Sequence, residues 1–312
     1  MRILSFLAAL AVLCGPVAAQ DITIATGRAG LTYAPIGRII AEGVSAATGL
    51  SVRAVESRGS LENVEAIASG AHPTGLAQSD VAFWAQDGSG IWSGRTPLTG
   101  LRTIAALYPE QMHLVARADA GIAALDDLRG RRVALDAVGS GTYVEARLVL
   151  EAAEFRSDEY AASDLSGAAA AEALERGEID AFFLVAGVPT AAVADLAARL
   201  PVVLVPIEGV PAEDLIGRHG FVEPSLIPEG TYAGVPDTPT LTVGAHWFVG
   251  ADVPEAVVFD LARGLFDPAT LRRLRREHPR GGAISLETAL DGVAVPLHEG
   301  ALRFYEEAGA LD

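Results

Sequence analysis

Cysteine is nearly absent from this sequence of 312 residues, in which Cys14 is the single example. That residue lies in a segment that we expect to be cleaved, so the mature protein has no disulfide framework, thiol nucleophile or cysteine metal site. The six histidines are scattered without the spacing of metal ligands. We therefore expect neither a metal site nor a cofactor.

Positive charge is also scarce. Lysine is missing, and 23 arginines stand against 40 aspartates and glutamates, which gives a net charge of −17. This excess of negative charge argues against binding to nucleic acid or to anionic lipid surfaces. Beyond the N-terminus no apolar run is long enough to span a bilayer, which predicts a soluble mature protein.

The N-terminus has the features of a cleavable signal peptide. A short positive start precedes the apolar segment 3–13, and small residues at 17–19 suit cleavage before Gln20. Gly15 and Pro16 break a helix at this point, which disfavours the alternative of a buried N-terminal helix. Leu13 stands before Cys14, where lipoprotein signals have a small residue. We therefore predict a signal peptide over residues 1–19 and an exported protein without a lipid anchor.

Strand-like and helix-like segments alternate along the chain. We predict strands at 21–25, 51–57, 74–78, 101–107, 132–135, 181–185 and 201–207, and helices at 35–47, 60–69, 142–151 and 168–176. This order predicts an α/β fold whose mostly parallel sheets carry helices on both faces, with ligands bound where strands lead into helices. The Pro-rich stretch 224–239 is expected to be an ordered loop or, equally, a flexible lid.

Two segments of the chain look alike, and they predict where it passes between two lobes. Residues 113–119 and 246–252 each read as a strand that precedes a loop and a helix. A strand entering a lobe and a strand leaving it would have this pattern. We predict lobe one from 20–116 plus 241–312 and lobe two from 117–240, with the ligand cleft between them.

Catalytic signatures are missing from the sequence. The glycines around Ser140 lack the G-x-S-x-G spacing of a nucleophile elbow, and there is no Walker loop and no G-x-G-x-x-G. The chain offers instead four polar junctions between a loop and a helix, at 30–33, 58–63, 139–143 and 187–190. The first turn of a helix presents free N–H groups with a partial positive charge. Such junctions suit a carboxylate held without a catalytic step.

Arg28 and Arg58 stand beside two of these junctions, and a guanidinium matches a carboxylate with two parallel hydrogen bonds. Each feature also has a purely structural alternative. Thr142 and Glu145 fit a capping box, and Ser60 could equally cap its own helix. The two arginines could be solvated surface residues.

The chain carries a series of motifs in a fixed order. They are ATGRAGLTYAPIG at 25–37, GSLENV at 59–64, GLAQSDV at 75–81, LYPE at 107–110, GSGT at 139–142, DAFF at 180–183, AGVPT at 186–190, IPEGTY at 227–232 and HEGA at 298–301. Together they resemble the TAXI-type solute-binding proteins of tripartite ATP-independent periplasmic (TRAP) transporters. The resemblance covers nearly the whole mature chain.

The resemblance implies a periplasmic receptor with a type II-like periplasmic-binding-protein fold. It implies a small organic anion held between the lobes, a glutamate-like amino acid or a dicarboxylate such as 2-oxoglutarate, and delivery to an integral-membrane TRAP permease. We expect a monomer and no enzymatic activity. By motif position the expected ligand contacts are Thr32, Tyr33, Ser60, Asn63, Gln78, Tyr108, Ser140, Thr142, Tyr143, Pro189 and Thr190, and we add Arg58 as a carboxylate partner.

Three residues depart from the family pattern. Arg28 and Arg58 stand where small residues are usual, and Leu31 stands where glycine is common. These departures leave the ligand open and would favour a second carboxylate. Two alternatives to the TRAP receptor remain: a receptor of similar fold that serves an ATP-driven importer, and a secreted α/β enzyme that acts on a carboxylate substrate.

Overall fold

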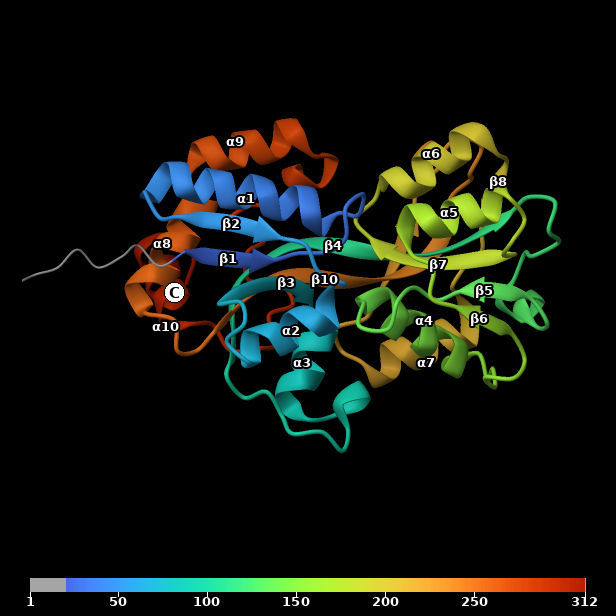
Figure 1. Cartoon of the computed structure of the whole chain (residues 1–312), viewed down its shortest axis with the longest axis horizontal. Helices are drawn as coiled ribbons and strands as arrows, with labels where there is room; N and C mark the ends of the chain where they lie inside the picture. Colours follow the sequence, from blue (N-terminus) through green and yellow to red (C-terminus); the bar gives the residue numbers. More distant parts are fainter. Residues whose placement is uncertain (1–20, 312) are drawn as a thin grey trace, which may run out of the picture.

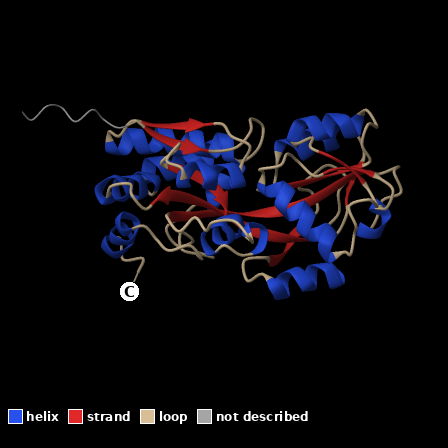
Figure 2. Cartoon of the chain, turned by 60° about the horizontal axis from the view of Figure 1, so that its bottom comes forward, coloured by secondary structure: helices blue, strands red, loops and turns tan. Residues whose placement is uncertain are grey.

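The computed structural model describes residues 21–311, so the predicted signal peptide lies outside the described residues. Two lobes lie side by side and are joined by long strands through the centre of the molecule (Figure 1). Helices pack against the strands of both lobes (Figure 2). Within residues 21–311, no helix combines the length and apolar character that a membrane span requires. The predicted two-lobed α/β class is confirmed.

Lobe one begins with a parallel three-stranded unit. Strands β2 (Val52–Val55), β1 (Ile22–Ala25) and β3 (Thr74–Gln78) lie in that order. Its helices are α1 (Tyr33–Thr48), α2 (Ser60–Ala68), α3 (Ser79–Asp87), α8 (Glu255–Leu265), α9 (Pro268–Glu277) and α10 (Glu299–Glu307), with short 3₁₀ turns η1 (Gly90–Trp92) and η3 (Pro279–Ala283). In α1 the apolar residues recur at helical spacing and face the core, as Ile36, Ile40 and Val44 show by their complete burial.

Lobe two repeats the alternation of strands and helices. Strands β7 (Ala181–Ala186), β5 (Arg132–Ala134) and β6 (Ala161–Ser163) are parallel neighbours. The other elements are η2 (Leu125–Leu128), α4 (Gly141–Ala152), α5 (Gly167–Glu175), α6 (Ala191–Arg199), β8 (Val202–Leu204), α7 (Gly209–Arg218) and β9 (Glu223–Ile227). Every residue of β7 is buried, as expected for an apolar strand covered on both faces.

Two long strands run through both lobes. The first half of β4 (Leu101–Arg117) pairs with β10 (Thr238–Gly250), and its second half pairs with β7 and β8. The second half of β10 pairs with β3 of lobe one, and its first half pairs with β9. The predicted lobe boundaries, after residue 116 and before residue 241, both fall inside these strands and stay a prediction.

The sheet is mixed, which corrects the expectation of mostly parallel sheets. All ten strands join in one sheet with the central order β2-β1-β3-β10-β4-β7-β5-β6. The outer strands of each lobe are parallel, but every pairing that involves β4 or β10 with another named strand is antiparallel. The reason is that these two strands carry the chain out of lobe one and back in opposite directions.

Apolar clusters fill each lobe, and one cluster joins them. In this shared cluster, Val81 and Trp84 of α3 pack with Val144 of α4, and Leu148 and Phe221 are partly buried against them. Trp84 meets Phe221 edge-on, with ring centroids 5.0 Å apart. The lobes are therefore in direct apolar contact beside the ligand cleft.

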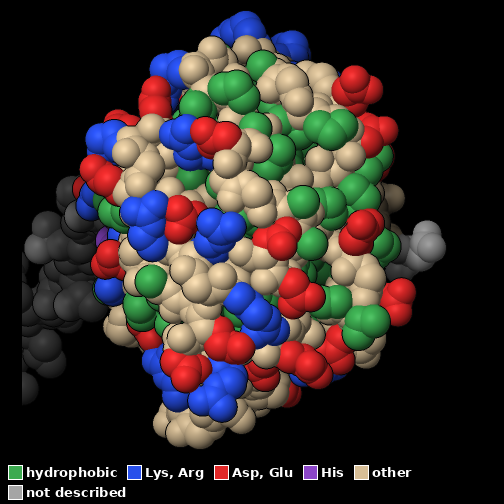
Figure 3. All heavy atoms as spheres, turned by 90° about the vertical axis from the view of Figure 1, so that its right-hand side faces the viewer, with side chains coloured by type: hydrophobic (Ala, Val, Ile, Leu, Met, Phe, Trp, Pro, Cys, Tyr) green, Lys and Arg blue, Asp and Glu red, His purple; other side chains and the backbone are tan. Residues whose placement is uncertain are grey.

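The charge on the surface is mixed in sign. At the outer end of lobe two, arginine and acidic side chains are interspersed (Figure 3). Lobe two also holds ion pairs, such as Arg132 with Asp180 at 2.7 Å and Arg199 with Glu175 at 3.0 Å. The net negative charge of the chain is thus spread out on this face.

Candidate functional site

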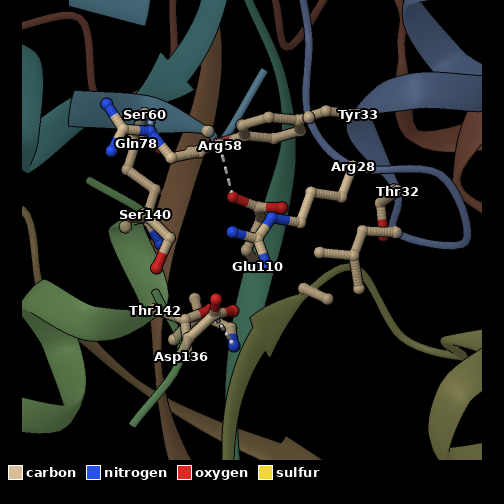
Figure 4. Close-up of a pocket in the computed structure, with 16 residues that line it drawn as sticks. Arg28, Thr32, Tyr33, Arg58, Ser60, Gln78, Glu110, Asp136, Ser140 and Thr142 are labelled. Atoms are coloured by element: carbon tan, nitrogen blue, oxygen red, sulfur yellow. Dashed lines mark hydrogen bonds between the residues drawn. The ribbon is translucent and has the colours of Figure 1, made fainter. Parts of the chain in front are cut away.

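A cavity of about 40 Å³ lies between the lobes. Its walls come from the loop before α1, the N-termini of α2 and α4, and the ends of β3, β5 and β7, together with β4 (Figure 4). One water needs roughly 10–15 Å³ of such space, so the cavity has room for about three. Seven of the twelve predicted contacts line it: Thr32, Tyr33, Arg58, Ser60, Gln78, Ser140 and Thr142.

Tyr33 and Glu110 meet at the centre of the cavity. Tyr33 opens α1, and its hydroxyl donates to Glu110 Oε2 at 2.8 Å (Figure 4). Glu110 projects from β4 and is only 3% exposed. Burial raises the pKa of Glu110 to about 8, although the hydrogen bond from Tyr33 opposes the rise. At neutral pH this side chain is therefore mostly a neutral acid that can donate its own proton.

Ser60 and Gln78 form the lobe-one wall near α2. Ser60 is the first residue of α2, and its hydroxyl accepts from the backbone N–H of Gln78 at 3.1 Å. The amide oxygen of Gln78 is buried and has no donor. It lies directly against Gly141 of lobe two, where an added Cβ would stand 1.6 Å from it. Gln78 thus offers a ligand an acceptor at the point where the lobes touch.

Ser140 and Thr142 form the lobe-two wall, and the hydroxyl of each accepts from a backbone N–H. Ser140 is the N-cap of α4, and its hydroxyl accepts from the N–H of Tyr143 at 3.0 Å. Thr142 also lines the cavity, and its hydroxyl accepts from the N–H of Val185 at 3.0 Å, which ties α4 to β7. The capping box proposed for Thr142 and Glu145 is therefore wrong, because Ser140, two residues earlier, occupies the cap position.

Asp136 is a second buried acid of the cavity, and sequence reasoning missed it. It follows β5, is 2% exposed, and has a positive φ of 74°, which is unusual for a residue other than glycine. Burial raises the pKa of Asp136 to about 6, while the N–H of Ala137 and the nearby Arg28 oppose the rise. The sequence did contain a signal for Asp136, because it is an acidic residue directly after a predicted strand.

Arg28 and Arg58 line the cavity but differ in their partners. Arg28 reaches from the loop before α1 to the hydroxyl of Ser166 in lobe two, so it bridges the cleft. Arg58 pairs with Glu62 at 2.8 Å, and its side chain is 57% exposed. Arg58, in the loop before α2, is therefore held at the rim by Glu62 of α2, whereas Arg28 is placed to face a ligand.

Five predicted contacts do not line this cavity. Asn63 is fully buried, and its amide nitrogen donates to three backbone carbonyls, at Ala25, Thr26 and Leu76, so it fastens β1 to β3. Tyr108 is buried in the core of lobe one, and the side chain of Tyr143 packs against the core of lobe two. Pro189 and Thr190 line a neighbouring cavity of about 340 Å³ instead.

Several contacts show that the two lobes are closed on each other. The N–H groups of Leu61 and Glu62, at the start of α2, donate to the carbonyl of Gly139 at 3.1 and 3.3 Å. On the opposite side, Arg280 of lobe one donates to the carbonyl of Val188 at 3.0 Å. A molecule larger than a few waters enters only if these contacts loosen.

The lining of the cavity consists largely of polar and charged side chains. Among the described residues that line the cavity there is no histidine to activate Ser60 or Ser140 as a nucleophile. Within residues 21–311, no cluster of three or more histidine, cysteine or acidic side chains could hold a metal ion. What remains is a set of donors and acids that converge from both lobes.

Comparison with known proteins agrees with this architecture. A family model described as the NMT1-like family matches residues 24–309. Among solved structures, a protein from Bordetella bronchiseptica RB50 is similar at a TM-score of 0.55 and 15% identity, over 92% of this chain and 98% of that one. The periplasmic binding protein BugD is similar at 0.53 and 15%, over 93% and 98%.

A third structure is the alkanesulfonate-binding protein SsuA from Xanthomonas axonopodis pv. citri bound to MOPS, with a TM-score of 0.50 and 16% identity over 91% of this chain and 83% of that one. At these identities the likeness concerns the fold alone. The comparisons do not support the TAXI subtype, which stays a prediction. The chain belongs to the NMT1-like family and has the fold of the periplasmic binding proteins.

Proposed function

We propose that this protein is a periplasmic solute-binding receptor that closes over a small organic acid and delivers it to a membrane transporter. The observation that carries the proposal is the cavity between the lobes, with polar groups converging from both sides and direct contacts between the lobes at its rim. A ligand that touches both lobes is bound only when they close, which is how binding becomes a signal for the transporter.

The lining favours a carboxylate that also carries a donor. Arg28 and the N-terminus of α4 suit an anionic group. Glu110 and Asp136 suit an ammonium group, or accept a carboxylate only while they hold a proton. An amino acid such as glutamate fits this set better than 2-oxoglutarate does. The similar SsuA structure, whose name describes an alkanesulfonate-binding protein, likewise concerns an organic anion.

A thermal-shift screen tests the ligand class. L-glutamate, L-glutamine, succinate and 2-oxoglutarate would each be added to the purified protein. A ligand at a hundredfold excess over its Kd stabilises the folded state by about 2.7 kcal/mol. We expect the largest shift with an acidic amino acid, and Arg28→Gln should reduce that shift while Arg53→Gln, an exposed arginine on β2, leaves it unchanged. If only neutral ligands raise the melting temperature, the proposal that the ligand is an anion is rejected.

The transporter is the second part of the proposal. An ATP-driven importer agrees better with the comparisons than the TRAP permease implied by the family resemblance. Measuring the uptake of labelled ligand by cells distinguishes the ATP-driven importer from the TRAP permease. Collapse of the ion gradient at constant ATP stops a TRAP permease, whereas depletion of ATP at constant gradient stops the importer.

A further inference from the structure

Two carboxyl groups from opposite lobes face each other in the apolar contact between α3 and α4. Asp80, in the first turn of α3, is 0% exposed, and Glu145 of α4 is 1% exposed. None of their four carboxyl oxygens has an N–H or hydroxyl donor at hydrogen-bond geometry. The ligand cavity does not include either group. These two acids are therefore buried without the partners that buried charges require.

The surroundings do not supply a compensating cation. Val81, Trp84 and Val144 form the apolar lining. His219, after α7, is a base close to Asp80, and burial lowers its pKa. Arg218, Asp214 and Glu151 lie around that histidine, and Arg218 is already paired with Asp214 at 2.6 Å.

Other ionisable groups near α3 do not balance the pair either. Glu110 on β4 lies near Asp80, but it is neutral below its pKa of about 8 and negative above it, so it supplies no positive charge. His246 on β10, a strand that packs against α3, is buried, and this lowers its pKa to about 4, so it is neutral above that pH. The pair therefore keeps at least one proton while the lobes are closed.

Burial raises the pKa of both Asp80 and Glu145, and the charge of Asp80 raises that of Glu145 further. The pairing of Asp80 with Glu145, and after it the positive end of the first-turn N–H dipoles of α3, oppose the rise for Asp80 but do not outweigh burial. In water both groups would return to ordinary carboxyl values near about 4. In the closed form, one carboxyl group therefore donates a hydrogen bond to the other across the interface through a shared proton. When the lobes separate, water reaches both groups and the proton dissociates.

We propose that closure of the lobes takes up a proton, which Asp80 and Glu145 share, so that acid favours the closed receptor and alkali the open one. This inference rests on the lobe closure of the proposed function but not on the identity of the ligand. Between the pH at which the exposed carboxyls ionise and the pH at which the closed pair does, the ratio of closed to open molecules falls about tenfold per pH unit.

The distance between the lobes, measured without ligand, tests this coupling. Ser69→Cys on lobe one and Ser157→Cys on lobe two are exposed sites for spin labels, and the chain beyond Cys14 has no other cysteine. In the otherwise unaltered protein we expect the distribution of distances to move from short to long as the pH rises from about 5 to 9. Glu145→Gln and Asp80→Asn should keep the short distance throughout. Asp87→Asn, an exposed acid at the end of α3, is the matched control and should respond as the parent protein does.

Two results would overturn the inference. One is a distance that does not change with pH; the other is a response that survives in Glu145→Gln and Asp80→Asn but disappears in Glu110→Gln or His219→Gln. Should the single variants fail to fold, the infrared band of a protonated carboxyl group decides, measured in the Glu110→Gln background. It must be present in the closed form and vanish on opening. A failed ligand screen with an intact pH response would reject the proposed ligand and leave the proton coupling standing.

Discussion

Gly141 is the residue at which closure can be blocked with one methyl group. It opens α4 in lobe two, and a Cβ there would lie 1.6 Å from Gln78 Oε1 and 2.9 Å from Ser60 Oγ, both in lobe one. Ordinary contact begins near 3.4 Å, so Gly141→Ala forces Gln78 out of its place or the lobes apart. Gln78 is 2% exposed, so its amide can move aside only into the cavity that the ligand is to occupy.

The expected size of the effect follows from overpacking, which costs about 1–3 kcal/mol in a well-packed site. Because the clash exists only when the lobes meet, this cost weakens ligand binding by about 5- to 150-fold. Within lobe two the substitution does no harm, since alanine in a helix is about 0.5–1 kcal/mol more favourable than glycine. We therefore expect weak binding in a protein whose open form is as stable as the parent.

Calorimetric titration with the acid selected by the thermal-shift screen measures the loss of affinity. Gly217→Ala in α7 is the matched control, because a Cβ at that position meets nothing within 4 Å. Replacing Gln78 with alanine in the Gly141→Ala background should restore the closed distance between spin labels. If Gly141→Ala binds as tightly as Gly217→Ala, the contact between Gln78 and Gly141 is not part of closure and the reasoning fails.

Three further predictions concern single side chains. Ser140→Ala removes the cap of α4 and should lower the free energy of unfolding by about 1 kcal/mol in urea titrations, with exposed Ser157→Ala unchanged. Tyr232→Phe removes a buried hydroxyl that bonds to His113 Nε2 at 2.9 Å and accepts from the N–H of Thr190 at 3.0 Å, so we expect a loss of about 1–3 kcal/mol by the same method. The pKa of Glu110 is about 8 in the folded protein and about 4.3 in the unfolded chain, so the free energy of unfolding falls as the pH rises between these values. Glu110→Gln should flatten that part of the pH profile of stability. An unchanged slope would contradict the assignment.

Much of the fold could be read from the order of apolar and turn-forming residues. The predicted strand at 74–78 matches β3, and the helix predicted at 60–69 matches α2 to within one residue. The Pro-rich stretch 224–239 was expected to be a loop, yet it contains most of β9 and the start of β10. Proline is tolerated in β9 because that strand pairs on one side only, with β10.

The site could be predicted in part. Three of the four polar junctions converge on one cavity, because loops that follow parallel strands meet at the same edge of a sheet. The fourth, at 187–190, faces the neighbouring cavity, and local sequence carries no information on which side of α6 a loop turns. Glu110 and Asp136 were missed because burial, not residue type, makes them unusual. The meeting of Asp80 with Glu145 depends on how two lobes pack, which no local pattern encodes.

Native mass spectrometry of the protein purified from the periplasm tests the central claim most directly. The account predicts one small organic acid per protein chain, released when the protein is unfolded, and recovered unchanged after incubation with excess protein. Loss of that molecule in Gly141→Ala but not in Gly217→Ala would place it between the closed lobes. The proposed receptor function would be contradicted if the protein carries no such molecule and binds none of the acids in the screen. It would also be contradicted if the protein converts the molecule into a product.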